Sequence, residues 1–242
     1  MPTKSIITAC DKNQEYLLLW WVKNIRKNVS PDTIICVFDM GISLTVRHKL
    51  VTEGVYVETH EPLEGVHPWF NKPFCLEKTK TDQTLWLDTD CEVVNNIDDI
   101  WENGGDYLLL ANDPVIGEMG KPLTANTGVI LYNNHLNCTN AINIWKTGCL
   151  DTDLRGDQDV LESLLPNEFI KTHLDQKYNW LRLLTFRGKH HKDARIMHWT
   201  GPVGKEHIKN KLIPRQIALE SPGLTNLGHN YTPTGVERMS DE

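Results

Sequence analysis

The sequence predicts an α/β protein built on a single doubly wound, mostly parallel sheet flanked by helices. Its first half alternates short apolar segments with amphipathic ones, which is the order of repeated βαβ units. The apolar segments are continuous rather than alternating, as in strands that helices cover on both faces. The 242 residues, 40% of them hydrophobic and 24% charged, suit one large domain, and no Pro/Gly/Ser-rich linker interrupts the middle of the chain.

Each expected element has a local reason. Residues 5–9 form an apolar run that turns polar at Cys10 and Asp11, and residues 15–27 carry apolar side chains at a helical period. A turn at residues 30–32 then precedes the second apolar run. The expected strands are residues 5–9, 33–38, 55–58, 83–87, 107–111, 127–132 and 195–197, and the expected helices are residues 15–27, 43–51, 73–80, 137–146 and 158–165.

Periodicity is lost in the last part of the chain. From Gly201 onward, and more so from Ser221, Gly, Pro, Asn and Thr become frequent. We therefore expect one domain over residues 1–205 and a C-terminal segment, residues 206–242, that wraps around it or is partly disordered.

Charge and hydropathy argue against two classes of partner. The chain has 25 Lys plus Arg against 32 Asp plus Glu, a formal net charge of -7, whereas nucleic acids are bound mainly by clustered cations. It lacks the run of about 18 apolar residues that a membrane span needs, and its start does not resemble a signal peptide. We therefore expect a cytoplasmic protein with no nucleic-acid partner and no integral membrane span.

The six cysteines are expected to be reduced. They form no C-x-x-C pair, and most lie in apolar segments such as residues 34–38. A free cysteine packs as a small hydrophobic side chain, so this placement favours core thiols over disulfides or a zinc site.

Three predicted strands end at an aspartate. Asp11, Asp39 and Asp88 each follow an apolar run, and ligand sites of open parallel sheets lie beyond the carboxyl ends of the strands. Only Asp88-Thr89-Asp90 places two carboxylates there, because the other Asp-x-Asp pairs follow no buried strand. Paired carboxylates suit Mg²⁺ or Mn²⁺ bridging a diphosphate, whereas the alternative is a turn whose Asp side chains cap backbone N–H groups. The spacing alone leaves these two interpretations equal.

Six short motifs occur in a fixed order between about residues 5 and 205. They are TACD at 8–11, LWLDTD at 85–90, NTGVILYN at 126–133, GDQD at 156–159, LDQKYNW at 174–180, and HWTG at 198–201 followed by Lys205. In this order they resemble the GT-A glycosyltransferases, and most closely glycosyltransferase family 8, the glycogenin and lipopolysaccharide galactosyltransferase type. The resemblance implies a GT-A glycosyltransferase domain over residues 1–205.

The resemblance also implies a role for each site residue. The residues that would hold a metal ion, Mn²⁺ or Mg²⁺, are Asp88, Asp90 and His198. The residues that would contact the nucleotide sugar are Ala9, Asp11, Lys72, Asp88, Thr89, Asn126 and Gly201. Asp157 and Gln158 would lie beside the anomeric carbon of the donor, and Lys205 would neutralise the departing diphosphate. Residues 178–180 would pack and shape the pocket rather than react.

Structural alternatives stand beside several of these assignments. Asp11 and Asp157 are also suited to cap the helices that follow them. His198 could have a purely structural role, and Lys72 could be a solvated lysine at a helix end. Lys205 lacks the Pro-Trp that usually follows the corresponding lysine in the family, which leaves the geometry of the closing loop open.

The function implied by the resemblance is metal-dependent transfer of a hexose from a nucleotide diphosphate sugar, in particular a UDP-sugar, to a hydroxyl of a glycan or another acceptor. Transfer would retain the anomeric configuration. A sugar nucleotidyltransferase is one alternative, but it needs a Gly-rich loop after the first strand, where this chain reads Ala9-Cys10-Asp11. A non-catalytic binder of sugar nucleotides or glycans is another. Donor identity would depend on residues 112–121.

Overall fold

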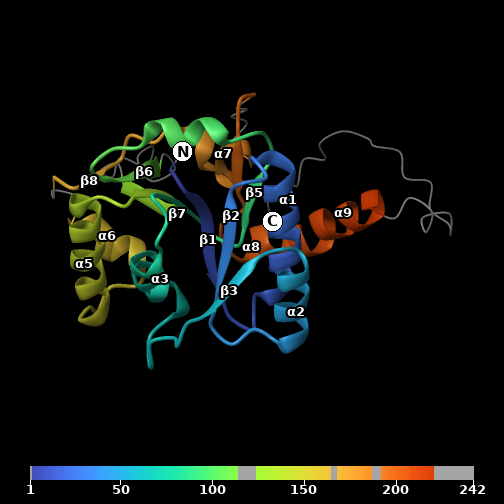
Figure 1. Cartoon of the computed structure of the whole chain (residues 1–242), viewed down its shortest axis with the longest axis horizontal. Helices are drawn as coiled ribbons and strands as arrows, with labels where there is room; N and C mark the ends of the chain where they lie inside the picture. Colours follow the sequence, from blue (N-terminus) through green and yellow to red (C-terminus); the bar gives the residue numbers. More distant parts are fainter. Residues whose placement is uncertain (1, 114–123, 165–167, 187–191, 221–242) are drawn as a thin grey trace.

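The structure is a computed structural model and describes residues 2–113, 124–164, 168–186 and 192–220. Within these ranges, seven strands form a main sheet in the order β3-β2-β1-β4-β7-β6-β8 (Figure 1). The bounds of these strands are β1 Lys4–Cys10, β2 Ile34–Asp39, β3 Tyr56–Thr59, β4 Gln83–Leu87, β6 Leu108–Asp113, β7 Thr124–Asn133 and β8 Ile170–Lys171.

The main sheet is mostly parallel, as predicted. Strands β3, β2, β1 and β4 run parallel to one another, and Ile7 of β1 pairs with Cys36 on one side and Trp86 on the other. Strand β7 is antiparallel to both of its neighbours, β4 and β6. Because chain order reverses between β1 and β4, their carboxyl ends open a crevice of the kind that binds ligands in doubly wound sheets.

Helices cover both faces of this sheet (Figure 1). The helices α1 and α2 lie on one face and α3, α5 and α6 on the other. Trp21 of α1 and Trp145 of α5 are fully buried in the two core layers. The bounds are α1 Leu18–Asn28, α2 Leu44–Thr52, α3 Lys72–Lys78, α5 Leu136–Leu150 and α6 Asp157–Leu164, and the 3₁₀ turns are η1 Glu15–Leu17, η2 Pro68–Asn71, η3 Asp98–Asn103 and η4 Gln176–Tyr178.

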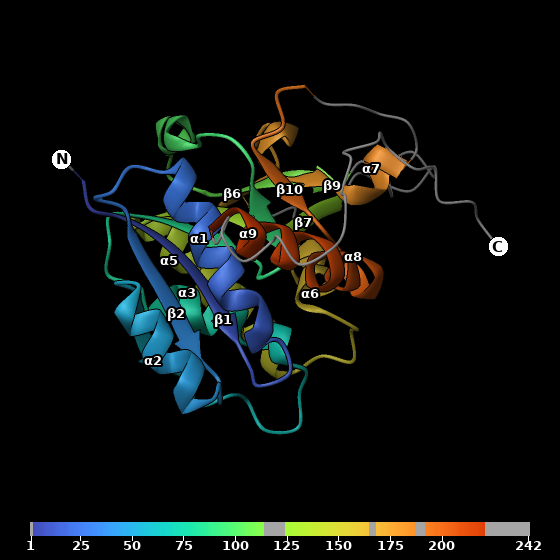
Figure 2. The same ribbon diagram turned by 90° about the vertical axis from the view of Figure 1, so that its right-hand side faces the viewer.

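A second, smaller sheet lies beside the main one and was not expected from the sequence (Figure 2). Within the described residues it consists of β5 (Cys91–Val93), β10 (Ile196–His198) and β9 (Trp180–Leu181), in that order. The antiparallel pairing of β10 with β5 sets His198 opposite Cys91. Strands of two or three residues are too short to display an apolar period, so only β10 was predicted.

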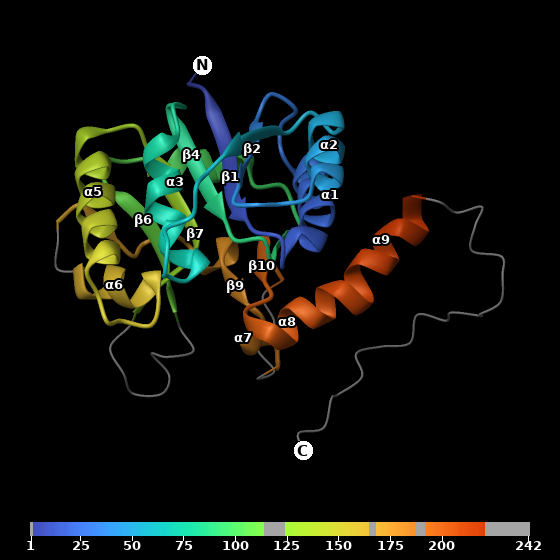
Figure 3. The same ribbon diagram turned by 90° about the horizontal axis from the view of Figure 1, so that it is seen from below.

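The chain after residue 200 is helical as far as it is described. The helices α8 (Gly201–His207) and α9 (Ile213–Glu220) continue through a π-helical turn, Ile208–Leu212, and pass along α1 (Figure 3). Ile208 is buried there, and Lys23 of α1 forms an ion pair with Glu220. Residues 221–242 lie outside the described residues, so a domain boundary at residue 205 stays a prediction. The remaining helix is α7 (Arg182–Phe186).

The structure bears on two predictions from the sequence, the state of the cysteines and the absence of a membrane span. All six cysteines are free thiols and all except Cys36 are buried, which confirms the predicted reduced core thiols. No helix among the described residues is long and apolar enough to cross a membrane. The segment expected to read the donor, residues 112–121, lies mostly outside the described residues.

Candidate functional site

A cavity of about 420 Å³ opens at the carboxyl ends of β1 and β4. Its walls come from these two strands, from β7, from the starts of α3 and α6, and from the turn between β10 and α8. The sequence-predicted site residues all line it: Ala9, Asp11, Lys72, Asp88, Thr89, Asp90, Asn126, Asp157, Gln158, His198, Gly201 and Lys205. The fold therefore brings them together, while their individual roles remain predictions.

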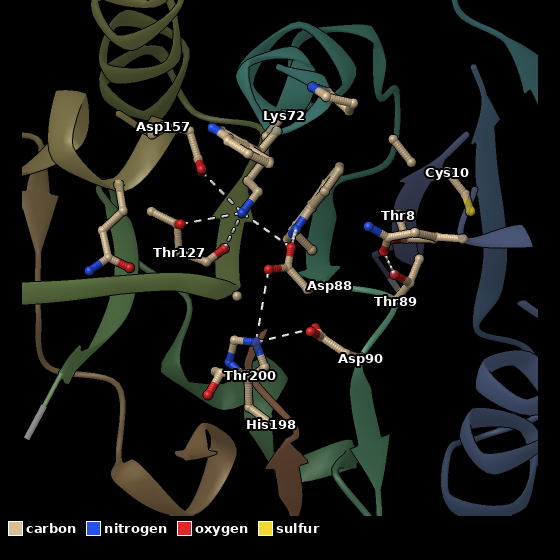
Figure 4. A pocket seen from close by; sticks show the side chains of 18 of the residues that line it. Thr8, Cys10, Lys72, Asp88, Thr89, Asp90, Thr127, Asp157, His198 and Thr200 are labelled. Atoms are coloured by element: carbon tan, nitrogen blue, oxygen red, sulfur yellow. Dashed lines mark hydrogen bonds and ion pairs between the residues drawn. The ribbon is translucent and has the colours of Figure 1, made fainter. Parts of the chain in front are cut away.

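The centre of the cavity is a cluster of acids, one imidazole and two ammonium groups, of which Figure 4 labels Lys72. His198 Nε2 lies 3.3 Å from Asp90 Oδ1 and 3.9 Å from Asp88 Oδ2. Lys205 Nζ lies 3.3 Å from the other oxygen of Asp90. Carboxylate oxygens and an imidazole nitrogen thus converge from β10 and from the turn between β4 and β5.

The side chain of Asn179 orients His198. His198 Nδ1 donates to Asn179 Oδ1 over 3.0 Å, because the amide nitrogen of Asn179 is engaged elsewhere, and Nε2 is the ring nitrogen that faces the acids. Asn179 Nδ2 in turn donates to Asn126 Oδ1 over 2.9 Å, and the backbone N–H of Gly128 donates to the same oxygen. The amide nitrogen of Asn126 is then the group that remains for a ligand. Such outer hydrogen bonds fix the tautomer and ring orientation of metal-binding histidines.

Gly128 is required by the position of His198. A Cβ atom built on Gly128 would lie 2.0 Å from Cε1 of the His198 ring. The absence of a side chain at this position lets β7 pass directly beside the imidazole. The motif at 126–128 therefore supports the imidazole as well as bordering the cavity.

Asp90 is ionised in this setting. Burial by itself would raise its pKa, but the contacts with His198 and Lys205 lower the pKa to about 2. The pKa of the Lys205 ammonium is raised by Asp90 and Asp88, which outweigh the opposing effect of its burial. Both groups are therefore charged at neutral pH.

Lys72 is buried and links two acids from different elements. It is only 4% exposed, so the alternative of a solvated lysine at a helix end is wrong. Its Nζ lies 3.1 Å from Asp88 Oδ1 and 3.1 Å from Asp157 Oδ2, and it donates to the backbone oxygen of Thr127 over 2.8 Å (Figure 4). Trp86 Nε1 also donates to Asp88 Oδ1 over 2.7 Å. With Oδ1 occupied twice, Asp88 directs Oδ2 towards His198.

The pKa values of Lys72 and Asp157 depend on the contacts among Lys72, Asp88 and Asp157. Burial alone would lower the pKa of Lys72, but Asp157 and Asp88 raise it well above its ordinary value. Burial raises the pKa of Asp157, while Lys72 acts in the opposite direction. Lys72 is thus a permanent cation that compensates two carboxylates inside the protein.

The chemistry of the donor atoms fits a divalent metal. Geometry alone also groups Cys91 with Asp90 and His198 as possible ligands. However, burial raises the pKa of the Cys91 thiol far above its ordinary value, and its Sγ contacts the backbone oxygen of Gly128. The thiol is thus engaged by a backbone oxygen, and Mn²⁺ and Mg²⁺ prefer oxygen ligands to sulfur. Oxygen from Asp88 and Asp90 with nitrogen from His198 is the set that Mn²⁺ or Mg²⁺ accepts.

Asp11 and Gln14, which follow the carboxyl end of β1, form one end of the cavity. Asp11 Oδ1 accepts from the backbone N–H groups of Asn13 and Gln14, at 3.1 and 3.2 Å, so it closes the turn before η1, whereas the N-cap position of η1 is Gln14 and not Asp11. Thr89 donates to Gln14 Oε1 over 3.3 Å and so joins this turn to the segment that carries Asp88 and Asp90. The turn closed by Asp11 therefore forms the wall at this end of the cavity, independently of any ligand that Asp11 contacts.

The opposite end lies at the start of α6. Gln158 Nε2 donates to Glu162 over 3.1 Å, which leaves the amide oxygen of Gln158 as the atom available to a ligand. Trp69 borders the same end, and its Nε1 donates to the backbone oxygen of Arg155 over 3.2 Å. Asp157 begins this helix, and its carboxylate pairs with Lys72 rather than facing solvent.

Sequence reasoning missed several residues that build the site. Asn179 lies in a recognised motif, but its partner His198 could not be identified without the small sheet. Trp86 looked like a core residue because it lies in a buried strand, and Trp69 carries no motif at all. Of these three residues, only Asn179 could have been singled out from the sequence, because it is a polar residue between two aromatic ones.

No protein-family profile matches the chain, and no curated protein matches its sequence. Solved structures do match. Galactosyltransferase LgtC in complex with donor and acceptor sugar analogues has a TM-score of 0.59 and 20% identity, over 82% of this chain and 87% of that chain. The apo form of glycosyltransferase GlyE from Streptococcus pneumoniae TIGR4 has a TM-score of 0.62 and 19% identity, over 83% of this chain and 55% of that chain. Mouse xyloside xylosyltransferase 1 has a TM-score of 0.55 and 12% identity, over 81% of this chain and 96% of that chain. This likeness confirms the predicted GT-A fold.

Proposed function

We propose that this chain is a metal-dependent glycosyltransferase that moves a hexose from a UDP-sugar to an acceptor hydroxyl with retention of configuration. The observation that carries the proposal is the convergence of Asp88, Asp90 and His198 with two buried or half-buried lysines in one cavity of a GT-A fold. A site that only bound a neutral sugar would not need this concentration of charge.

The residues that would hold the metal are Asp88, Asp90 and His198. A bound Mn²⁺ or Mg²⁺ would supply positive charge to the diphosphate as it leaves the sugar. Asn179 keeps His198 Nε2 directed at that position, and Lys72 holds Asp88 with one oxygen turned towards it.

Lys205 is the residue suited to assist departure of the diphosphate. Its ammonium group is protonated and lies at the edge of the cluster, 3.3 Å from Asp90. A nucleotide diphosphate bound beside Asp90 would therefore meet a half-buried cation that is held in place by an ion pair.

Asp157 and Gln158 are assigned to the reacting carbon of the donor. The amide oxygen of Gln158 is a weak nucleophile but can stabilise positive charge that develops on the sugar ring. Asp157 is held by Lys72, so it orients this end of the cavity rather than attacking. In this proposal the acceptor attacks from the leaving-group side, so that configuration is retained, as the family resemblance implies.

The test is release of UDP from a panel of UDP-sugars without acceptor, first with Mn²⁺ and then with EDTA. We expect release from one sugar with Mn²⁺ and none with EDTA. The same panel should be titrated by calorimetry. UDP binding without release would indicate a non-catalytic binder, and release that EDTA leaves unchanged would remove the metal from the proposal.

A further inference from the structure

Trp69 is the only exposed tryptophan of the eight in the chain, all of which lie within the described residues. It is 44% exposed, whereas the other seven are buried or half-buried. The next residues of the same segment, Phe70, Asn71 and Lys72, all point inward and are buried. A large apolar ring is thus presented to solvent by a turn whose neighbouring side chains are all engaged.

The ring of Trp69 is held in place. It stacks on His67 with ring centres 4.3 Å apart and planes inclined by 12°. Its Nε1 donates to the backbone oxygen of Arg155 over 3.2 Å, which ties η2 to the segment before α6. A ring fixed by stacking and by a hydrogen bond loses little entropy when a ligand packs against it.

The turn that carries the ring is anchored from below. Asn71 Oδ1 accepts from the backbone N–H of Leu63 over 2.9 Å and from His60 Nε2 over 3.1 Å. Asn71 Nδ2 donates to the backbone oxygen of Pro68 over 3.1 Å. Buried polar groups therefore set the position of Trp69 before any ligand arrives.

The ring borders the cavity at the end away from β1. Arg155, whose backbone oxygen it contacts, and Gly156, which also lines the cavity, immediately precede Asp157 and Gln158. A ligand on Trp69 would therefore lie beside the reacting carbon of the donor, whereas the nucleotide end lies at Asp11. Beside the ring, the side chains of Arg155 and Asp159 are exposed and offer hydrogen-bond partners of both polarities.

We infer that Trp69 is the stacking platform of an acceptor subsite and that the acceptor is a saccharide, whose pyranose ring lies against the indole. This inference rests on the proposed function and narrows its acceptor to a glycan. The apolar C–H face of a pyranose matches an indole ring, while its hydroxyl groups match the charged groups of Arg155 and Asp159. An acceptor hydroxyl of a lipid or a protein side chain has no ring to stack here.

The first measurement is disaccharide binding by saturation-transfer difference NMR. Lactose, maltose and cellobiose are titrated with UDP and Mn²⁺ present, on the wild-type chain, Trp69→Ala, Trp69→Phe and Tyr56→Ala. Tyr56 is the control because it is exposed on the edge strand β3 and does not line the cavity. We expect at least one disaccharide to bind, about tenfold more weakly to Trp69→Ala, with most of the affinity kept in Trp69→Phe. In turnover, the acceptor KM should change more than the donor KM.

A second measurement needs no variant. Acrylamide quenching of tryptophan fluorescence in the wild-type chain reports mainly on Trp69, because the other tryptophans are shielded. A bound disaccharide should reduce the quenching. Equal affinity of Trp69→Ala and the wild-type chain, or quenching unchanged by a bound disaccharide, would overturn the inference.

The two proposals fail in different ways. The chain could bind UDP and release UDP from a UDP-sugar while none of the three disaccharides binds. In that case the saccharide subsite is wrong and the proposed function stands. If UDP is neither bound nor released, the proposed function is wrong, whatever the disaccharides do.

Discussion

Aspartates at the carboxyl ends of two parallel strands of the main sheet, β2 and β4, have different kinds of partner in this molecule. Asp39 ends β2, and its Oδ1 accepts from the backbone N–H groups of Gly41 and Ile42 while its Oδ2 pairs with Arg47. All of these partners lie within the turn and helix that follow it. Both carboxylate oxygens of Asp39 are therefore engaged within the turn and helix that follow it.

The strand end at β4 is different because its partners come from distant parts of the chain. Asp90 contacts His198 of β10 and Lys205 of α8, and Asp88 contacts Lys72 of α3. These partners surround a cavity instead of closing a turn. The comparison teaches that a strand-end carboxylate is a site candidate when its partners are remote and a structural cap when they are local.

The largest effect should come from removing the metal-side carboxylate. Asp90→Asn keeps the shape of the side chain but loses its charge, so metal-dependent UDP release should fall by about 1000-fold. The measurement is initial rate against Mn²⁺ concentration, with circular dichroism to confirm the fold. Asp39→Asn is the matched control, since it makes the same change at the other strand end. A fully active Asp90→Asn variant would remove Asp90 from the metal site.

The next effect concerns stability at the same strand end. Lys72→Met leaves Asp88 and Asp157 without their buried cation, which should cost about 3 kcal/mol of unfolding free energy. Urea unfolding measures it. Lys146→Met is the control, because Lys146 pairs with Glu77 at the surface of α5 and should contribute less than about 1 kcal/mol. Equal stability of the two variants would show that the buried ion pairs do not stabilise the fold.

The predictable part of the fold is the part whose strands are long and buried. Runs such as residues 33–38 are apolar on both faces because helices cover both sides of the parallel sheet, and this pattern is visible in one sequence. Strands β5 and β9 have three and two residues, so they show no period. The helical segment 201–220 was missed because Gly and Pro residues at its start indicate a loop.

The site was predictable for residues that chemistry singles out and not for residues that only position them. The pair Asp88 and Asp90 could be found because two carboxylates follow a buried strand. The burial of Lys72 could not be found, since it results from contacts of its side chain with Thr127 of β7 and Asp157 of α6, which lie far away in the sequence. The pairing of Asn179 with His198 depends on a sheet that the sequence does not display.

A moderate effect should follow from releasing His198. Asn179→Leu removes the acceptor for His198 Nδ1 and the donor to Asn126, while Asn179→Asp keeps the acceptor. We expect Mn²⁺ affinity to fall about tenfold in the leucine variant and much less in the aspartate variant. Calorimetric titration with Mn²⁺ measures this without turnover. Unchanged affinity in Asn179→Leu would mean that packing against Gly128 alone orients the imidazole.

The smallest effect tests the local strand end. In Asp39→Asn the two backbone contacts to Oδ1 can survive, but the charge opposite Arg47 is lost, so the unfolding free energy should fall by about 1 kcal/mol. Because Asp39 does not line the cavity, Mn²⁺ affinity and UDP release by the folded protein should not change. The measurements are urea unfolding and the Mn²⁺ titration on one preparation. Weakened Mn²⁺ binding would mean that Asp39 at the end of β2 affects the metal site. In that case, the distinction between local and remote partners would not separate structural carboxylates from functional ones.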